Sequence, residues 1–274
     1  MSYFELKDGM KLYYEDTGSG DPVILMHGWT SSHNIFVKPA EKLSEKARCI
    51  IYDHRGHGGS KAATAVGDNV TMETLASDLN ELITGLSLSN VTLVGWSMGA
   101  GVAMTYIKAY GCGALRQVVL CDMTPKQINE GGWKLGLNQG KYTREDMERD
   151  QKGNVPFIKL YHDFAANAMP KLKMIPEFLV RPHLEQIIGK CDEGVLRSLA
   201  HSMKEQDNRD FVDSLTVPLT YFYAVPGSLF SPELEKWYKE SVKVPFKAGA
   251  IRNSTHLMIE EHPDEFAAKL STLL

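Results

Sequence analysis

Residues 91–100, with the sequence VTLVGWSMGA, join two patterns at one serine. The apolar, β-branched first half predicts a buried strand, and the small residues from Gly99 onward predict a helix. Gly-x-Ser-x-Gly between them predicts a sharp turn that raises the Ser97 hydroxyl, because a Cβ at Gly95 or Gly99 would collide with a neighbouring element. The helix N-terminus favours negative charge, so the pattern predicts a nucleophile. The alternative is a glycine-rich turn with a surface serine.

Strands and helices alternate on both sides of this turn. Continuous apolar runs predict buried strands at Val23–Met26, Arg48–Tyr52 and Gln117–Cys121. Thr71 is suited to cap a helix whose apolar positions follow the helical period as far as Leu86. This alternation predicts an α/β protein with a mostly parallel, doubly wound sheet and helices on both of its faces.

The two ends of the chain continue the same alternation. Two alternating runs between Tyr3 and Glu15 predict a hairpin that turns at Asp8-Gly9. The other predicted elements are a helix over residues 35–46, strands over 217–223 and about 244–251, and helices that begin near Ser231 and Pro263.

The alternation is interrupted over residues 125–213. This region combines helical patches with several prolines and with aromatic and methionine residues, and it is too long for a loop. We expect an inserted helical cap here. The predicted core domain is then made of residues 1–124 and 214–274.

Composition bounds the class of protein. The chain has 274 residues, 43% of them hydrophobic, and a formal net charge of -4, so nothing in its charge favours nucleic acid or an anionic membrane as a partner. The first residues lack the apolar run of a signal peptide, and no window is apolar enough for a membrane span. The four cysteines are scattered without a Cys-x-x-Cys pair, which favours free thiols. We expect a cytoplasmic protein.

Four segments together resemble the α/β-hydrolase family in their order and spacing. They are HGW at 27–29, YDHRGHGGS at 52–60, GWSMG at 95–99 and NSTH at 253–256, the last followed by EEHP at 260–263. The likeness covers nearly the whole chain outside the predicted cap. It implies the α/β-hydrolase fold, with a sheet of about eight strands, and a serine hydrolase.

The resemblance also implies catalytic roles. Ser97 is expected to be the nucleophile, and an imidazole has the pKa needed to take its proton. His256 follows the last predicted strand, where this fold delivers its histidine, whereas His262 directly precedes Pro263 and is interpreted as a helix-start residue. For His256 the alternative is a loop histidine whose hydrogen bonds are satisfied locally.

The third member of the triad departs from the commonest family pattern. Many relatives carry an acid after the strand that ends near Tyr223, but residues 224–230 (AVPGSLF) contain no carboxylate. The best candidate is Asp122, which follows the preceding strand and keeps the chain order of nucleophile, acid and histidine. The alternatives are that Asp122 only caps the start of the cap region, that Glu233 is the acid, or that the site is a dyad.

The resemblance implies an oxyanion hole formed by the backbone amides of Trp29 and Met98. Aromatic side chains from the cap and the loops are candidates for the walls of the substrate pocket, with core packing as the alternative for each. These candidates are Trp29, Trp133, Phe157, Tyr161, Phe164 and Phe230. They favour a small, largely apolar acyl or alkyl substrate.

A metal site is not expected. The histidines at 27, 33, 54 and 57 lack a metal-binding spacing, and Asp53 and Arg55 are predicted to form ion pairs and hydrogen bonds that fix their loop. The sequence has no dinucleotide or phosphate-binding glycine motif, so no cofactor is expected either.

These patterns predict a cofactor-independent serine hydrolase that cleaves a small carboxylic ester or lactone through an acyl-enzyme intermediate. The same triad also serves C–C bond hydrolases, thioesterases and perhydrolases, and these remain open. So does a ligand-binding sensor with weak turnover, because the usual acid is missing. The expected partner is a small-molecule substrate, and the chain is expected to be a monomer or a homodimer.

Overall fold

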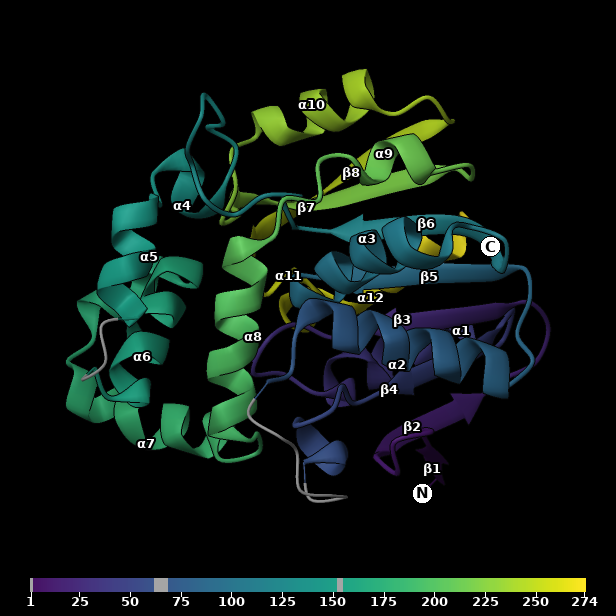
Figure 1. Cartoon of the computed structure of the whole chain (residues 1–274), viewed down its shortest axis with the longest axis horizontal. Helices are drawn as coiled ribbons and strands as arrows, with labels where there is room; N and C mark the ends of the chain where they lie inside the picture. The colour runs from purple at the N-terminus through teal and green to yellow at the C-terminus, as the bar shows by residue number, and fades with distance from the viewer. Residues whose placement is uncertain (1, 62–68, 152–154) are drawn as a thin grey trace.

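The computed structural model describes residues 2–61, 69–151 and 155–274, and these residues contain one sheet of eight strands (Figure 1). The strands are β1 (Ser2–Glu5), β2 (Lys11–Thr17), β3 (Pro22–Met26), β4 (Arg48–Tyr52), β5 (Val91–Trp96), β6 (Leu115–Cys121), β7 (Leu219–Gly227) and β8 (Phe246–Thr255). Their spatial order is β1-β2-β4-β3-β5-β6-β7-β8. The predicted eight-stranded, mostly parallel sheet is confirmed.

The sheet is antiparallel only at its N-terminal edge within the described residues. β1 pairs antiparallel with β2, as the predicted hairpin requires, and β2 pairs antiparallel with β4, whereas every other neighbouring pair is parallel. All residues of β3 and β5 are buried, because helices cover both faces of the sheet at its centre. Their unbroken apolar runs in the sequence reflect this burial.

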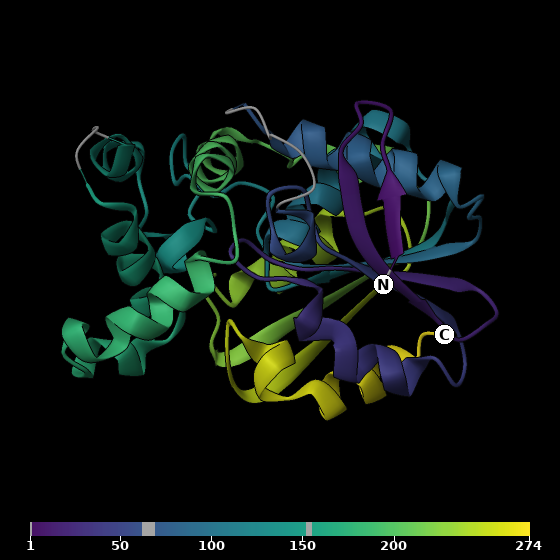
Figure 2. The same cartoon turned by 90° about the horizontal axis from the view of Figure 1, so that it is seen from below.

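Helices form a layer on each face of the sheet (Figure 2). On one face, α1 (Val37–Leu43) packs against α12 (Pro263–Ser271), and on the other, α2 (Met72–Gly85) packs against α3 (Met98–Tyr110). Thr71 caps α2 as predicted, since its hydroxyl oxygen accepts a hydrogen bond from the amide of Thr74, and the Thr74 hydroxyl accepts one from the amide of Thr71.

The chain between β6 and β7 leaves the sheet and forms helices beside one end of it (Figure 1). These are α4 (Leu137–Gly140), α5 (Arg144–Gln151), α6 (Phe157–Ala168), the 3-10 helix η3 (Pro170–Met174), α7 (Glu177–Ile188) and α8 (Glu193–Glu205). The last helix of this stretch, α9 (Phe211–Ser214), instead packs against α3. Residues 152–154 of the predicted cap, and residues 1 and 62–68 of the predicted core, lie outside the described residues. The division into a core domain and a cap at 125–213 stays a prediction.

The remaining helices are η1 (His33–Phe36), η2 (Gly58–Ser60), α10 (Glu233–Ser241) and α11 (Met258–Glu261). The helix predicted over 35–46 is therefore shorter than expected, because a 3-10 turn precedes α1 and the chain leaves the helix after Leu43. The last strand begins and ends later than predicted, at 246–255 rather than 244–251. It lies at the edge of the sheet, and this position sets the burial of its residues, so hydrophobic periodicity does not mark where the strand begins and ends.

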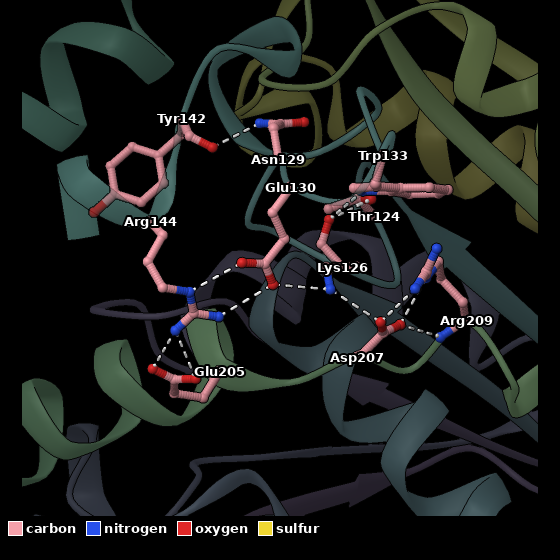
Figure 3. Close-up of polar contacts among 10 residues, drawn as sticks. All are labelled: Thr124, Lys126, Asn129, Glu130, Trp133, Tyr142, Arg144, Glu205, Asp207 and Arg209. Carbon is pink, nitrogen blue, oxygen red and sulfur yellow. Dashed lines mark hydrogen bonds and ion pairs between the residues drawn. The ribbon is translucent and has the colours of Figure 1, made fainter. Parts of the chain in front are cut away.

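Ion pairs join the two segments by which the helical insertion leaves and rejoins the sheet (Figure 3). The ammonium of Lys126 lies 3.1 Å from Glu130 and 3.0 Å from Asp207. Arg144 lies 3.0 Å from Glu130 and 2.9 Å from Glu205 at the end of α8. An exposed ion pair contributes less than about 1 kcal/mol, so this cluster fixes the relative position of the two segments more than it stabilises the fold.

Two further expectations from the sequence concern the cysteine thiols and membrane-spanning helices. All four cysteines are buried free thiols, as the scattered spacing predicted. Among the described residues, no helix has the length and apolarity required to cross a membrane.

Candidate active site

Ser97 stands alone between the end of β5 and the first residue of α3. Its backbone has φ 53° and ψ -120°, a strained conformation that few residues other than glycine adopt. A Cβ on Gly95 would lie 2.3 Å from the carbonyl oxygen of Gly99, and a Cβ on Gly99 would lie 2.3 Å from the carbonyl oxygen of Met26. The collisions predicted from the sequence are therefore present, and a side chain at either position would force the backbone of the turn to shift.

His256 comes directly after β8, and its ring reaches the serine. Its Nε2 lies 2.9 Å from Ser97 Oγ. The indole of Trp96 lies against the ring, with centroids 5.3 Å apart, and donates a hydrogen bond of 2.9 Å to the His256 carbonyl oxygen. The ring is thus held from its backbone and from one face, and only 2% of the residue is exposed.

Asp122 comes directly after β6 and lies on the far side of the same imidazole. Its Oδ2 is 2.6 Å from His256 Nδ1, and its Oδ1 accepts a hydrogen bond of 3.3 Å from the amide of Ala224. The carboxylate is fully buried. Ser97, His256 and Asp122 therefore form one hydrogen-bonded chain, in which a proton on Nδ1 leaves Nε2 free to accept from the serine hydroxyl.

The sequence alternatives to His256 and Asp122 lie elsewhere in the structure. His262 precedes α12, and its Nε2 donates to the carbonyl oxygen of Asn253 at 3.2 Å. Glu233 begins α10, and its backbone amide donates a hydrogen bond to the Ser231 hydroxyl. The structure brings neither residue to the imidazole of His256. Among the candidate acids, only Asp122 has a hydrogen bond to it within the described residues.

The predicted oxyanion donors flank the serine. Met98 is the first residue of α3, and Trp29 follows Gly28, on which a Cβ would lie 3.1 Å from Ser97 Cβ. Within the described parts of the chain, no group accepts a hydrogen bond from the backbone amide of Trp29 or Met98. Both amides are therefore available to a ligand, and their oxyanion role stays a prediction.

The loop after β4 is fixed by two buried carboxylates, one within the loop and one on α2. Asp53 accepts hydrogen bonds from the amides of His33 and Gly59, at 2.6 and 2.7 Å. Arg55 forms ion pairs of 2.6 Å with Asp78 and 2.8 Å with Asp8. The predicted role of Asp53 and Arg55 in holding this loop is confirmed, although the two residues act through separate partners.

The clustered histidines do not converge on a metal position. In the part of the chain that the structure describes, no group of three or more His, Cys, Asp or Glu side chains is placed to hold a metal ion. His27, His54 and His57 instead pack their rings against one another, and burial lowers the pKa of each. All three rings are buried in the core.

A cavity of about 850 Å³ opens onto Ser97 between the sheet and the inserted helices. Part of its wall is apolar, with side chains that include Trp29, Met123, Phe157, Phe164, Leu229 and Phe230. Another part is charged and includes Asp146, Arg149, Asp150, Asp163, Arg197 and Lys204. The wall is therefore more polar than the largely apolar pocket expected from the sequence.

Four of the six predicted pocket side chains line this cavity, and two do not. Trp133 instead lies edge-on to Trp237, and its indole donates to the carbonyl oxygen of Lys126 at 2.9 Å. Tyr161 packs edge-on against Trp29 in the small core of the insertion. Both predictions were wrong in location, because a single-sequence pattern does not fix which way an aromatic side chain of the insertion points.

The charged wall was not found by the sequence reasoning. Its clearest sequence signal is on α8, where Arg197, His201 and Lys204 recur at the helical period. A polar face of that kind ordinarily faces solvent. Only the position of α8 beside α5 and α6 turns this face toward a cavity (Figure 1).

Comparisons with known proteins bear on the fold. A family model described as alpha/beta hydrolase fold matches residues 21–146. The non-heme chloroperoxidase CPO-A1 of Kitasatospora aureofaciens is 39% identical over 120 residues, which are 43% of this chain and 42% of that protein. The AB hydrolase superfamily protein YisY of Bacillus subtilis (strain 168) is 27% identical over 250 residues, which are 89% of this chain and 90% of that protein.

A solved structure extends the likeness over the whole chain. The esterase EaEST from Exiguobacterium antarcticum is 26% identical with a TM-score of 0.76, and the superposition covers 99% of this chain and 98% of that one. The match to the chloroperoxidase spans less than half of that relative's own length, whereas the matches to YisY and EaEST span nearly all of theirs. The sheet order and the family match confirm the resemblance drawn from the motifs. The chain has the α/β-hydrolase fold.

Proposed function

We propose that the protein is a cofactor-independent serine hydrolase that cleaves a small carboxylic ester or lactone. The observation that carries the proposal is the hydrogen-bonded chain Ser97–His256–Asp122, which ends at a cavity large enough for a small molecule. The name of EaEST, an esterase of similar fold at 26% identity, supports an ester as the substrate.

The chemistry follows from the geometry. Ser97 Oγ attacks the carbonyl carbon while His256 Nε2 takes its proton, and the buried Asp122 carboxylate stabilises the imidazolium that results. The amides of Trp29 and Met98 donate to the oxyanion, each contributing about 3 kcal/mol to lowering the barrier. His256 then returns the proton to the leaving alcohol, which leaves an acyl group on Ser97.

Water completes the reaction. His256 takes a proton from a water molecule, the hydroxide attacks the acyl-enzyme, and the proton returns to Ser97 as the carboxylic acid leaves. In a lactone the leaving alcohol stays attached to the acyl group, so the same steps open the ring. No step requires a group other than the side chains and amides named.

A second activity is favoured by the relative CPO-A1, which is named a non-heme chloroperoxidase. If hydrogen peroxide replaces water in attacking the acyl-enzyme, the product is a peracid. The expected result is peracid formation from an acetate ester with hydrogen peroxide, lost in Ser97→Ala. A wild-type enzyme that forms acetate but no peracid would restrict the protein to hydrolysis.

The first prediction concerns the nucleophile. Ser97→Ala should abolish turnover of p-nitrophenyl acetate, because no other group forms the acyl-enzyme, while circular dichroism stays unchanged. The matched control is Ser44→Ala at the end of α1, which does not line the cavity and should keep full activity. Turnover retained in Ser97→Ala would reject the assignment.

A fluorophosphonate probe separates the remaining alternatives. Fast, stoichiometric labelling of Ser97 is expected, because the probe traps an activated serine. Fast labelling without ester turnover would indicate that the substrate is a thioester, or a diketone whose C–C bond is cleaved. Slow or absent labelling would favour a ligand-binding sensor.

A further inference from the structure

One face of α8 forms a wall of the cavity that contains Ser97. The helix contributes Arg197, Ala200, His201, Met203 and Lys204, and positions 197, 201 and 204 are three or four apart, as expected of one side of a helix. Leu196 and Leu199 on the same helix are fully buried. α8 therefore stands between the core and the helices α5 and α6 (Figure 1). Its polar side faces the cavity.

The carboxylates on the opposite wall already have partners. Asp146 lies 2.7 Å from Arg149, and Asp163 lies 2.9 Å from Lys159. Asp150 Oδ2 accepts a hydrogen bond of 2.7 Å from the Tyr142 hydroxyl. Each of these acids therefore already has a donor of its own.

Lys204 is the least exposed cation of the wall. Its side chain is only 19% exposed, and its nearest carboxylate oxygen, on Asp150, is 3.8 Å away, beyond hydrogen-bond distance. The ammonium lies 5.0 Å from the centre of the Tyr142 ring, and burial lowers its pKa. Arg197, by contrast, lies 2.8 Å from Glu193.

Taken over residues 2–61, 69–151 and 155–274, the structure gives the Lys204 ammonium no hydrogen-bond acceptor. An ammonium has three N–H donors, and a desolvated cation without acceptors is costly unless a ligand supplies them. Because the cavity that Lys204 lines is the one that contains Ser97, a single ligand can contact both residues.

We propose that Lys204 binds a carboxylate of the substrate, at the end remote from the ester carbonyl that Ser97 attacks. The inference rests on the proposed hydrolase function and specifies its substrate class as esters with a second, free carboxylate. A singly charged group suits the site better than a doubly charged phosphate, because the carboxylates of Asp146 and Asp150 repel both ligands and repel the phosphate more strongly. Lys204 is thus a residue that determines specificity.

The test compares two p-nitrophenyl esters with acyl chains of equal length, hexanoate and the monoester of adipic acid. They differ only in a terminal methyl or carboxylate. Wild type should show the higher kcat/KM on the adipate monoester. Lys204→Met should lower that kcat/KM about 10- to 100-fold, mainly through KM, because one charge-assisted contact is lost, and should leave the hexanoate ester unchanged.

Two further variants control the result. Lys204→Arg keeps the positive charge and should keep the preference for the carboxylate. Lys190→Met removes an exposed charge of the same insertion that does not line the cavity, and it should behave as wild type on both esters. Thermal unfolding of each variant shows whether a loss reflects folding. An equal loss on both esters in Lys204→Met would overturn the proposal.

Failure of this inference is distinguishable from failure of the proposed function. Wild type that cleaves both esters through Ser97 with equal kcat/KM would reject the carboxylate site and keep the hydrolase. If neither ester is cleaved, calorimetry tests the carboxylate site directly. It compares the binding of monomethyl adipate to the Ser97→Ala variant and to the Ser97→Ala/Lys204→Met variant. Tighter binding with Lys204 present supports the site, and equal affinity rejects it.

Discussion

The carboxylate of Asp122 uses both of its oxygens. One faces the imidazole of His256, and the other accepts the amide of Ala224 on the neighbouring strand. The segment that in many relatives carries the acid supplies a backbone donor here. This hydrogen bond orients the carboxylate, so the acid can come from β6 while the imidazole still arrives after β8.

The second prediction follows at this scale. Asp122→Asn should lower kcat by about 10³- to 10⁴-fold on an ester substrate, because an amide stabilises the wrong tautomer of the imidazole and not the imidazolium. Glu233→Gln serves as the control and should leave kcat unchanged. A loss below tenfold in Asp122→Asn would move the acid role to another residue.

The junction of β5 and α3 shows how tightly two elements constrain a residue. A Cβ on Gly99 would meet the backbone of β3 at 2.3 Å, and backbone cannot move aside as a flexible side chain does. Gly113, in the loop after α3, has no atom within 4 Å of such a Cβ. The two glycines therefore serve different purposes, although the sequence gives them the same letter.

The third prediction uses this matched pair. Gly99→Ala should lower the free energy of unfolding by about 1–3 kcal/mol, as overpacking does, and lower activity with it. Gly113→Ala should be neutral or stabilise by up to about 1 kcal/mol, since alanine restricts the unfolded chain. Urea unfolding measures both. Equal free energies for the two variants would contradict the steric account of the turn.

Across the whole molecule, the buried histidines set the response to acid. Burial lowers the pKa of His54 to about 3 and that of His57 to about 4, from 6.5 in the unfolded chain. At pH values between the lowered pKa of each folded histidine and 6.5, the unfolded state binds more protons than the folded state. The stability of the fold therefore falls as the pH falls below 6.5. The hydrogen bond from His33 lowers the pKa of Asp53, so this carboxylate adds a further loss of stability only below pH 3.8.

The fourth prediction is the resulting pH dependence. From pH 7 to pH 5 the free energy of unfolding should fall by about 2 kcal/mol for each of the two histidines. Neither ring nitrogen of His54 has a hydrogen-bond partner in the described residues. His54→Leu should therefore reduce the slope of the free energy of unfolding against pH without breaking a hydrogen bond. The exposed His183→Gln is the control. A slope unchanged in His54→Leu would refute the assignment.

Much of the fold and part of the site could be predicted because their signals are local. Apolar runs mark β3 and β5, the glycines mark the turn at Ser97, and the motif spacing points to His256. Asp122 emerged as a candidate because the expected acid was absent from residues 224–230. Its choice over Glu233 needed the geometry, since a hydrogen bond between residues 134 positions apart leaves no local pattern.

The sequence by itself determined the alternation of strands and helices, the strained serine turn and the order of the motifs, because each depends on neighbouring residues and backbone sterics. Only the tertiary structure decided which side chains line the cavity. Trp133 turned toward Trp237 and Lys204 turned toward Ser97's cavity for the same physical reason. The direction of a side chain in the insertion depends on how its helices pack, and that packing joins residues far apart in the chain.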